Sequence, residues 1–260
     1  MKGGTPNGII TLITDFGTAD GYAGAMKGVI FGINPRARVV DITHDIQPQN
    51  IRQAAHVLET IYSCYPPGTI HVIVVDPGVG TERRAVAIRT PQAYVVAPDN
   101  GLLNPVLKNV MEAVALTERR FWREPVSPTF HGRDVFAPVA AYLSQGIPLH
   151  EFGPVVSSLK SLSLPPPLVE EDGSVIGHVI HIDRFGNIIT DLEPGDLPCG
   201  SFRIEVRGHR IEGLSRTYAE GEGPLALVGS NGRLEIALRD GSAAEALRIA
   251  IGDRVEIRAT

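Results

Sequence analysis

Cysteines are scarce in this chain of 260 residues, and long hydrophobic runs are absent. The two cysteines, Cys64 and Cys199, lie far apart and fit neither a disulfide framework nor a metal-binding spacing. No apolar run is long enough to span a bilayer, and the polar residues 1–5 do not resemble a signal peptide. We therefore expect a cytoplasmic protein without a membrane partner.

Basic residues are fewer than acidic residues, so the net charge is -5 and the pI is about 5.9. No block of like charge interrupts the chain. This balance argues against a nucleic acid as the main partner. Hydrophobic residues make up 43% and charged residues 20% of the chain, which is typical of globular proteins. A chain of this length buries roughly 75% of its unfolded surface, enough for one large domain or two moderate ones.

Three common catalytic or nucleotide-binding motifs are missing. No Gly-x-Ser-x-Gly sequence is present, which argues against a serine hydrolase of the nucleophile-elbow type. No Gly-x-x-x-x-Gly-Lys-Ser/Thr sequence is present, so no P-loop is expected. The pair Gly78 and Gly80 has no third glycine at the spacing of a dinucleotide-binding fingerprint.

The first part of the chain alternates between strand and helix patterns, which predicts a mostly parallel α/β sandwich domain over residues 1–164. A β-branched apolar run at 69–75 is typical of a buried parallel strand. The other expected strands are 8–14, 38–42, 84–88, 93–97 and 112–116, and the expected helices are 23–31, 50–62, 102–107 and 135–144.

A proline run at 165–167 predicts a linker, and the pattern changes after it. Short strand patterns separated by glycine-rich turns predict a small antiparallel β-barrel or sandwich over residues 168–260, and the family resemblance described below implies the β-barrel. We expect the strands at 174–183, 186–191, 202–206, 209–211, 225–228, 233–237 and 254–257, with one helix at 242–247.

Acidic residues follow several of the strands expected in the first domain. Ligands of open α/β sheets bind beyond the carboxyl ends of the strands, so these positions are candidates for chemistry. Asp76 is the clearest, although Asp-Pro-Gly is also ordinary turn chemistry. Acids together with histidines also allow a metal-assisted phosphoesterase, but their spacing is not diagnostic. The residues concerned are Asp15, Asp20, Asp45, Asp76, His44, His56 and His131.

A set of short motifs identifies a family resemblance that covers nearly the whole chain. The motifs occur in the order Thr14-Asp15-Phe16-Gly17, Val75-Asp76-Pro77-Gly78-Val79-Gly80-Thr81 with Arg83, Pro98-Asp99-Asn100-Gly101, Phe130-His131-Gly132-Arg133-Asp134 and Asp183-Arg184-Phe185-Gly186-Asn187. Together they resemble the S-adenosylmethionine hydroxide adenosyltransferase family, the adenosine-forming S-adenosylmethionine (SAM) hydrolases. This family is related to the SAM-dependent fluorinase and chlorinase.

The resemblance implies that water attacks C5′ of the SAM ribose and that methionine leaves. Asp76, Arg83 and His131 correspond by motif to the water-handling residues. A sulfonium is already a good leaving group, so the main requirement is a poised nucleophile opposite the sulfur. Asp76 would accept a proton from water, His131 would share it, and Arg83 would keep the carboxylate ionised. The alternatives are a surface ion pair for Arg83 and a backbone-bonded histidine for His131.

The resemblance also implies a set of substrate-binding residues. Asp15 corresponds to a residue that accepts hydrogen bonds from both ribose hydroxyls, and Asp20 and Asp183 to the residues that hold the methionine ammonium. Asn187 is expected to read the adenine edge, although a turn residue after Gly186 is an alternative. The remaining candidates rest on a looser correspondence, with methionine carboxylate binding expected at Ser230 and Asn231 and adenine stacking at Tyr218.

Further expectations follow from the resemblance. The protein would be a homotrimer, its substrate SAM would bind between one subunit's first domain and its neighbour's second domain, and no cofactor or metal would be needed.

Two other functions remain open. One is a halogenase that uses the same substrate, which the presence of Arg83 with His131 disfavours. The other is a SAM- or adenosine-binding module without turnover, which the three intact residues Asp76, Arg83 and His131 disfavour.

Overall fold

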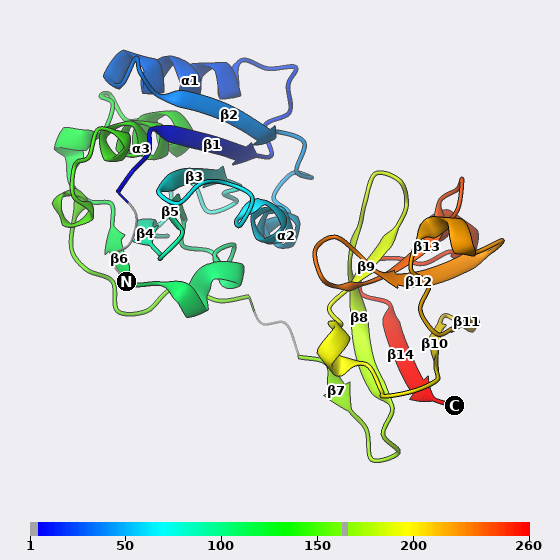
Figure 1. The fold of residues 1–260 in the computed structure, drawn as a ribbon. Coiled ribbons are helices and arrows are strands. Elements are labelled where there is room, and N and C mark those ends of the chain that lie inside the picture. The colour runs from blue at the N-terminus through cyan, green and yellow to red at the C-terminus, as the bar shows by residue number, and fades with distance from the viewer. Residues whose placement is uncertain (1–4, 163–165) are drawn as a thin grey trace. The chain divides into compact units, whose positions relative to one another are not determined.

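Strand β3 (Thr69–Val74) is fully buried and lies inside a six-stranded sheet of the N-terminal unit. Its side chains alternate between two hydrophobic clusters, because successive residues of a strand point to opposite faces. Ile70 and Val72 pack in the cluster that contains residues of helices α1 (Tyr22–Ile33) and α3 (Ala137–Ser144). Ile73 packs in the cluster that contains residues of α2 (Ile51–Ile61). The sheet is therefore covered on both faces, as in an α/β sandwich (Figure 1).

The computed structural model describes residues 5–162 and 166–260. The chain divides into two compact units, Met1–Leu162 and Ser163–Thr260. The predicted domain bounds 1–164 and 168–260 stay predictions, and residue 165 of the predicted proline linker lies outside the described residues.

The sheet of the N-terminal unit has the order β2-β1-β3-β5-β4-β6. Strands β2, β1, β3 and β5 pair in parallel, whereas β4 runs antiparallel to both of its neighbours, β5 and β6. The predicted mostly parallel sheet is confirmed in this mixed form. The strand bounds are β1 Ile9–Thr14, β2 Arg38–Thr43, β4 Ala85–Arg89, β5 Ala93–Pro98 and β6 Glu112–Ala115.

Two helices of this unit show how the sequence sets their starts. Asn50 caps α2, since its Oδ1 accepts a hydrogen bond from the backbone N–H of Gln53 at 3.0 Å. Helix α3 is preceded by a π-helical turn, Gly132–Phe136, and Pro138 lies in its first turn, where no backbone N–H is needed. The predicted helix at 102–107 is a 3-10 helix over Asn104–Asn109.

The C-terminal unit is a nearly closed antiparallel barrel with the strand order β11-β10-β14-β8-β9-β13-β12. Its inward side chains form one hydrophobic cluster, as the alternation in β10 (Phe202–Val206) requires. Ser242 caps helix α4 (Ala243–Leu247). The other strands are β8 Val175–Ile182, β9 Ile188–Thr190, β11 His209–Glu212, β12 Pro224–Val228, β13 Leu234–Leu238 and β14 Arg254–Ala259.

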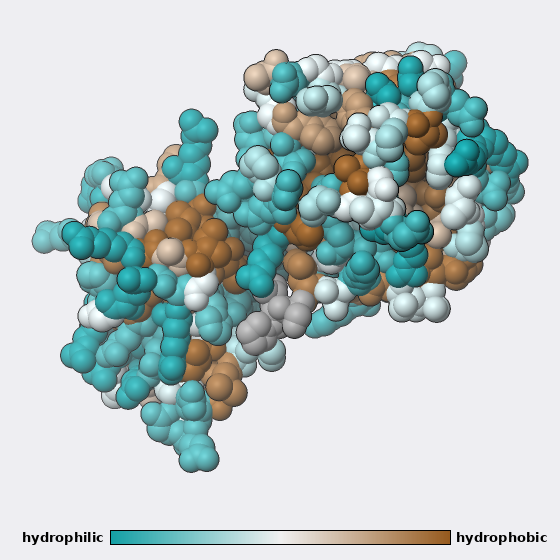
Figure 2. Space-filling model, turned by 180° about the vertical axis from the view of Figure 1, so that it is seen from behind, coloured by the Kyte–Doolittle hydropathy of each residue, from teal (hydrophilic) through white to brown (hydrophobic). Residues whose placement is uncertain are grey.

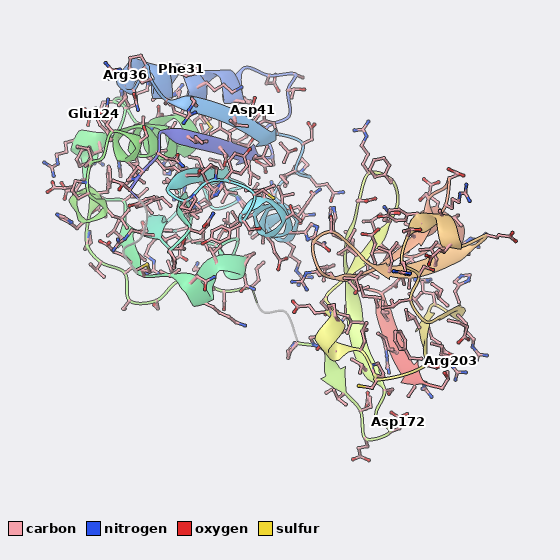
Figure 3. The ribbon with its side chains drawn as sticks, viewed as in Figure 1. Phe31, Arg36, Asp41, Glu124, Asp172 and Arg203 are labelled. Atoms are coloured by element: carbon pink, nitrogen blue, oxygen red, sulfur yellow. The ribbon has the colours of Figure 1, made fainter. Side chains whose placement is uncertain are left out.

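Strand β7 (Leu168–Val169) was not expected, because the first strand that we expected after the linker begins at residue 174. It pairs antiparallel with the start of β8 across a turn that contains Asp172, which is labelled in Figure 3. The Asp172 carboxylate accepts hydrogen bonds from the backbone N–H and the hydroxyl of Ser174, at 2.9 and 2.6 Å. Gly173 has a φ of +80°, a conformation that glycine adopts at little cost. An Asp-Gly pair between two apolar stretches is a hairpin signal that we overlooked.

The face of the molecule shown in Figure 2 is mostly hydrophilic, but hydrophobic side chains interrupt it in both units. Val155 of the N-terminal unit is 72% exposed, and Phe185 of the C-terminal unit is 75% exposed. Among the residues that the structure describes, none of the helices has both the length and the apolar character needed to cross a membrane.

Candidate functional site

The turn between β3 and β4 folds Arg83 back onto Asp76. Asp76 follows the carboxyl end of β3, and its carbonyl accepts a hydrogen bond from Val79 N at 3.2 Å. Thr81 closes the next turn, since its hydroxyl donates to the Gly78 carbonyl at 2.7 Å. Gly80 has a φ of +76°, and a Cβ there would lie 2.6 Å from the carbonyl oxygen of Pro128. A larger residue would therefore clash in this segment, and glycine allows the chain to turn back so that Arg83 reaches Asp76.

Asp76 and Arg83 form a buried ion pair. Their side chains are only 6% and 7% exposed. Arg83 Nε donates to Asp76 Oδ1 at 2.8 Å and to Oδ2 at 3.0 Å, and the NH2 group of Arg83 donates to Oδ2 as well. The guanidinium also lies over the Phe136 ring, 5.2 Å from its centroid. A fork-shaped cation held in this way keeps the carboxylate oriented.

His131 completes this cluster. Arg83 NH2 lies 3.1 Å from His131 Nδ1. A guanidinium can only donate, so Nδ1 accepts and the neutral ring carries its proton on Nε2. Burial, followed by the charge of Arg83, lowers the pKa of His131 below its usual 6.5, although Asp76 and Asp134 act in the opposite direction. The neutral imidazole is therefore the favoured form at pH 7, which suits a group that accepts a proton.

A cavity of about 240 Å³ adjoins Arg83 and His131. A water molecule occupies about 30 Å³ in the liquid, so the cavity has room for water beside these side chains. The other lining residues are Thr81, Arg84, Ala85, Ala115, Leu116, Thr117, Trp122 and Val135.

Asp15 and Asp20 both lie in the loop between β1 and α1. Asp15 follows the carboxyl end of β1, which pairs in parallel with β3, so Asp15 and Asp76 share one edge of the sheet. Asp15 Oδ2 accepts a hydrogen bond from the backbone N–H of Gln49 at 2.8 Å, which fixes the carboxylate and leaves Oδ1 available to a ligand. Asp20 is exposed five residues further along the same loop.

An aromatic cluster that the sequence analysis missed joins the Asp15 and His131 segments. The rings of Phe16, Tyr22 and Phe130 lie 5.2 to 5.7 Å apart in edge-on or tilted contacts. Phe16 follows Asp15, and Phe130 precedes His131, so ring packing brings their neighbours to one side of the sheet. The sequence signal was an aromatic residue next to Asp15 and another next to His131.

Asp41 and His44, two further polar residues of the first part, have structural partners. Asp41 on β2, labelled in Figure 3, has Oδ1 2.9 Å from His44 Nε2 and pairs with Lys27 through Oδ2. His44 Nδ1 lies 2.8 Å from the Thr14 hydroxyl. This network anchors the base of the Asp15 loop, since Gly17 N also donates to the His44 carbonyl at 2.7 Å. Within residues 5–162 and 166–260, no three His, Cys, Asp or Glu side chains are grouped as metal ligands would be.

In the C-terminal unit, Asp183 and Asn187 shape the turn between β8 and β9. Asp183 Oδ1 accepts from the backbone N–H groups of Phe185 at 2.8 Å and Asn187 at 2.9 Å, and Oδ2 accepts from the Asn187 amide at 3.0 Å. Gly186 packs against Ser242, since a Cβ there would lie 2.1 Å from its hydroxyl oxygen. Asp183 therefore has a structural role in the free chain, and the side-chain oxygen Oδ1 of Asn187 remains available as an acceptor.

Glu235 on β13 is a buried acid that the sequence analysis missed. It is 7% exposed, and its Oε1 accepts a hydrogen bond from the Tyr218 hydroxyl at 2.7 Å. Burial and the nearby Asp183 charge raise the pKa of Glu235, although the Tyr218 bond works against this. The bond to Glu235, followed by burial, raises the pKa of Tyr218 to about 12. A charged residue inside the apolar run of β13 was the available signal.

The turn that carries Ser230 and Asn231 lies against Glu235. A Cβ on Gly229 would be 2.6 Å from Glu235 Oε2. Asn231 Oδ1 accepts from the backbone N–H of Arg233 at 3.1 Å, which stabilises the turn, and Ser230 is exposed. The C-terminal candidates Asp183, Asn187, Tyr218 and Asn231 are thus linked through Glu235 and its neighbours.

Comparisons with known proteins agree with these motifs. The model of the SAM hydroxide adenosyltransferase N-terminal domain matches residues 10–153, and that of the C-terminal domain matches residues 177–256. The chain is 42% identical to "(R)-S-adenosyl-L-methionine hydrolase" of Salinispora tropica, covering 98% of this chain and 99% of that one. It is 28% identical to "Fluorinase" of Nocardia brasiliensis, with 98% and 99% covered.

A solved structure supports the same relationship. An uncharacterized conserved protein from Thermotoga maritima superposes with a TM-score of 0.89 at 37% identity, covering 95% of this chain and 99% of that one. The ordered motifs, the two matched domains and these identities lead to one conclusion: this chain belongs to the SAM hydroxide adenosyltransferase family.

Proposed function

We propose that this protein hydrolyses SAM to adenosine and L-methionine. The observation that carries the proposal is the buried Asp76–Arg83 ion pair in contact with a neutral His131, within a chain of this family. The names of relatives about 40% identical over nearly the full length support the reaction and suggest the (R) epimer at sulfur as the preferred substrate.

In the proposed step, the oxygen of water attacks C5′ of the ribose and the C5′–S bond breaks. The electron pair of that bond goes to sulfur, so methionine leaves as a neutral thioether and needs no acid. The water proton passes to the Asp76–His131 pair, and the reaction releases one proton overall. Asp76 orients the water and accepts the proton, because its carboxylate is fixed by Arg83 on two oxygens.

We assign substrate-binding roles to residues of both units. Asp15 accepts hydrogen bonds from the ribose hydroxyls, and Asp20 with Asp183 attracts the methionine ammonium. Asn187 reads the adenine edge, and Tyr218 stacks on the base. The methionine carboxylate binds at Ser230 and Asn231.

The test is a product assay by liquid chromatography and mass spectrometry. Purified, EDTA-treated protein is incubated with each sulfonium epimer in chloride-free buffer, and then with added chloride or fluoride, beside an Asp76→Ala variant. The proposal expects adenosine and methionine without metal or halide, formed about 100-fold more slowly by the variant, as for loss of a general base. A 5′-halo-5′-deoxyadenosine product would instead make the protein a halogenase. SAM binding without turnover would leave a binding module.

We further propose that the protein acts in the cytoplasm as a homotrimer without a cofactor, with each site shared between neighbouring subunits. Exposed apolar side chains such as Val155 and Phe185 would be covered in an assembly. Light scattering gives the mass, and mixing two inactive variants tests the shared site. Refolded equimolar Asp76→Ala and Asn187→Ala subunits should regain about one quarter of wild-type activity if head-to-tail neighbours supply the two halves. Sites within single chains would regain none.

A further inference from the structure

The motif Pro98-Asp99-Asn100-Gly101 has no role in the proposed chemistry, yet its side chains are firmly held. It follows β5, the parallel neighbour of β3, and therefore lies at the same edge of the sheet as Asp76. Asp99 is 1% exposed, so its carboxylate is desolvated and needs partners. The contacts of Asp99 and Asn100 explain what the motif does.

Asn100 holds the backbone immediately before Asp76. Its side-chain amide donates a hydrogen bond to the carbonyl oxygen of Val75 at 2.9 Å. The other end of the amide is fixed too, because its oxygen accepts from the backbone N–H of Leu102 at 3.3 Å. Val75 lies just past the last residue of β3, and the pairing of β3 with β5 ends earlier, at Val72 and Val96. The Asn100 amide therefore holds a carbonyl that lies beyond this strand pairing.

Asp99 holds the residue immediately after Arg83. Its Oδ2 accepts from Arg84 Nε at 2.9 Å and from Arg84 NH2, and its backbone N–H donates to the Arg84 carbonyl at 2.9 Å. Its Oδ1 accepts from the backbone N–H of Lys160 at 2.8 Å, which ties the same carboxylate to a distant segment. The side chain of Arg84 is 42% exposed, but the carboxylate that it binds is not.

Neighbouring residues of one motif therefore anchor the two chain segments that carry the ion pair. We propose that Asp99 and Asn100 are positioning residues that fix Asp76 and Arg83 relative to each other, and so hold Asp76 in its water-activating geometry. This inference rests on the proposed function. Neither residue touches the reacting atoms in this scheme, and both act through the backbone of Val75 and Arg84.

The test compares Asn100→Ala with Asn7→Ala. Asn7 is a matched control, because its side-chain amide donates to the carbonyls of Pro66 and Pro67, at 3.3 and 3.1 Å, beside the opposite end of β3. Both variants lose amide-to-backbone hydrogen bonds that hold the same strand. The measurements are kcat and KM for SAM hydrolysis per folded molecule, together with the melting temperature.

We expect Asn100→Ala to lower kcat by about 10- to 100-fold with KM changed less than about twofold, as misplacement of a catalytic group does. Asn7→Ala should keep kcat within about twofold even if its melting temperature falls, since it lies far from the acid. Equal kcat in Asn100→Ala and wild type, or equal losses in both variants, would overturn the inference. If the alanine variant does not fold, Asn100→Leu removes the same amide without adding a charge, keeps a similar side-chain volume and gives the same comparison.

A second readout does not depend on turnover. NMR titration of the His131 ring, assigned with a His131→Gln variant, measures its pKa in wild type and in Asp99→Asn. If Asp99 helps to hold Arg83 beside His131, loosening that contact raises the pKa of His131 toward its usual value. An unchanged pKa would count against the inference. An inactive wild type would instead refute the proposed function while this titration still decides the role of the motif.

Discussion

Replacing Arg83 with lysine separates the shape of the cation from its charge. In the structure, Arg83 reaches both carboxylate oxygens of Asp76 and also His131 Nδ1. A lysine ammonium is a compact charge on a flexible stem and does not reproduce this fork. It can remain beside Asp76, but it cannot hold the carboxylate and the imidazole in the same fixed arrangement.

The magnitude follows from the contacts that are lost. Each hydrogen bond to a charged group contributes about 1.5–3 kcal/mol, and the substitution removes the His131 contact and one of the Asp76 contacts. If about 3 kcal/mol of this stabilisation acts in the transition state, kcat falls by about 100-fold, since 1.36 kcal/mol corresponds to a factor of ten. KM should change little, because Arg83 is not among the residues proposed to hold the substrate.

Steady-state adenosine formation, measured by chromatography, gives kcat and KM for this variant. Arg207→Lys is the matched control, because Arg207 NH1 lies 3.0 and 3.3 Å from the two carboxylate oxygens of Asp253 in an exposed pair of the C-terminal unit. We expect its kcat to stay within about twofold of wild type, as exposed ion pairs contribute little. An Arg83→Lys enzyme with wild-type kcat and a raised KM would refute the reasoning, since Arg83 would then bind substrate.

Three further predictions concern pH. The pKa of His131 is held below 6.5, mainly by burial, so kcat should be constant above pH 7 and fall at a lower pH as the ring protonates, which a pH–rate profile measures. Burial lowers the pKa of His71 to about 4, so the unfolded chain binds more protons than the folded chain between pH 6.5 and 4. Acidification across that window should therefore cost about 3 kcal/mol of stability. Urea titrations should show this loss in wild type and not in His71→Asn. Burial raises the pKa of Glu235, so above pH 4.5 the folded state holds more protons than the unfolded chain and loses stability as the pH rises. Glu235→Gln cannot ionise and should therefore be more stable than wild type at pH 8. At pH 5 the melting temperatures of the two proteins should lie closer together.

The sequence predicted the parts of the fold that depend on local pattern. The apolar run ending at Val75 indicated a buried strand, and Asn50 marked a helix start, because burial and capping leave clear signatures within a few residues. Strand β7 was missed because two residues are too few to show a period. The π-helical turn at Gly132–Phe136 was missed because nothing in the sequence separates it from the helix that follows.

Sequence motifs selected the candidate site residues, but they could not show how residues far apart in the chain meet. The structure brings Asp76, Arg83 and His131 into contact, although no pattern of spacing would have paired residues 48 positions apart. Tyr218 was selected as a stacking residue, but its bond to Glu235 depends on how the 3-10 helix Tyr218–Glu220 is placed beside β13. A hydrogen bond between side chains has no sequence period, so only the fold could show it.

The charges around Asp76 also bear on which nucleophile the site favours. A halide would bring a second negative charge toward the carboxylate, which costs about 4 kcal/mol at 4 Å for an effective dielectric constant of 20. The charge of Arg83 offsets part of this cost, but its Nε and NH2 groups already donate to Asp76 and His131. Water carries no charge and can give a proton to the carboxylate. In the proposed scheme, the surroundings of Asp76 therefore suit water better than an anion.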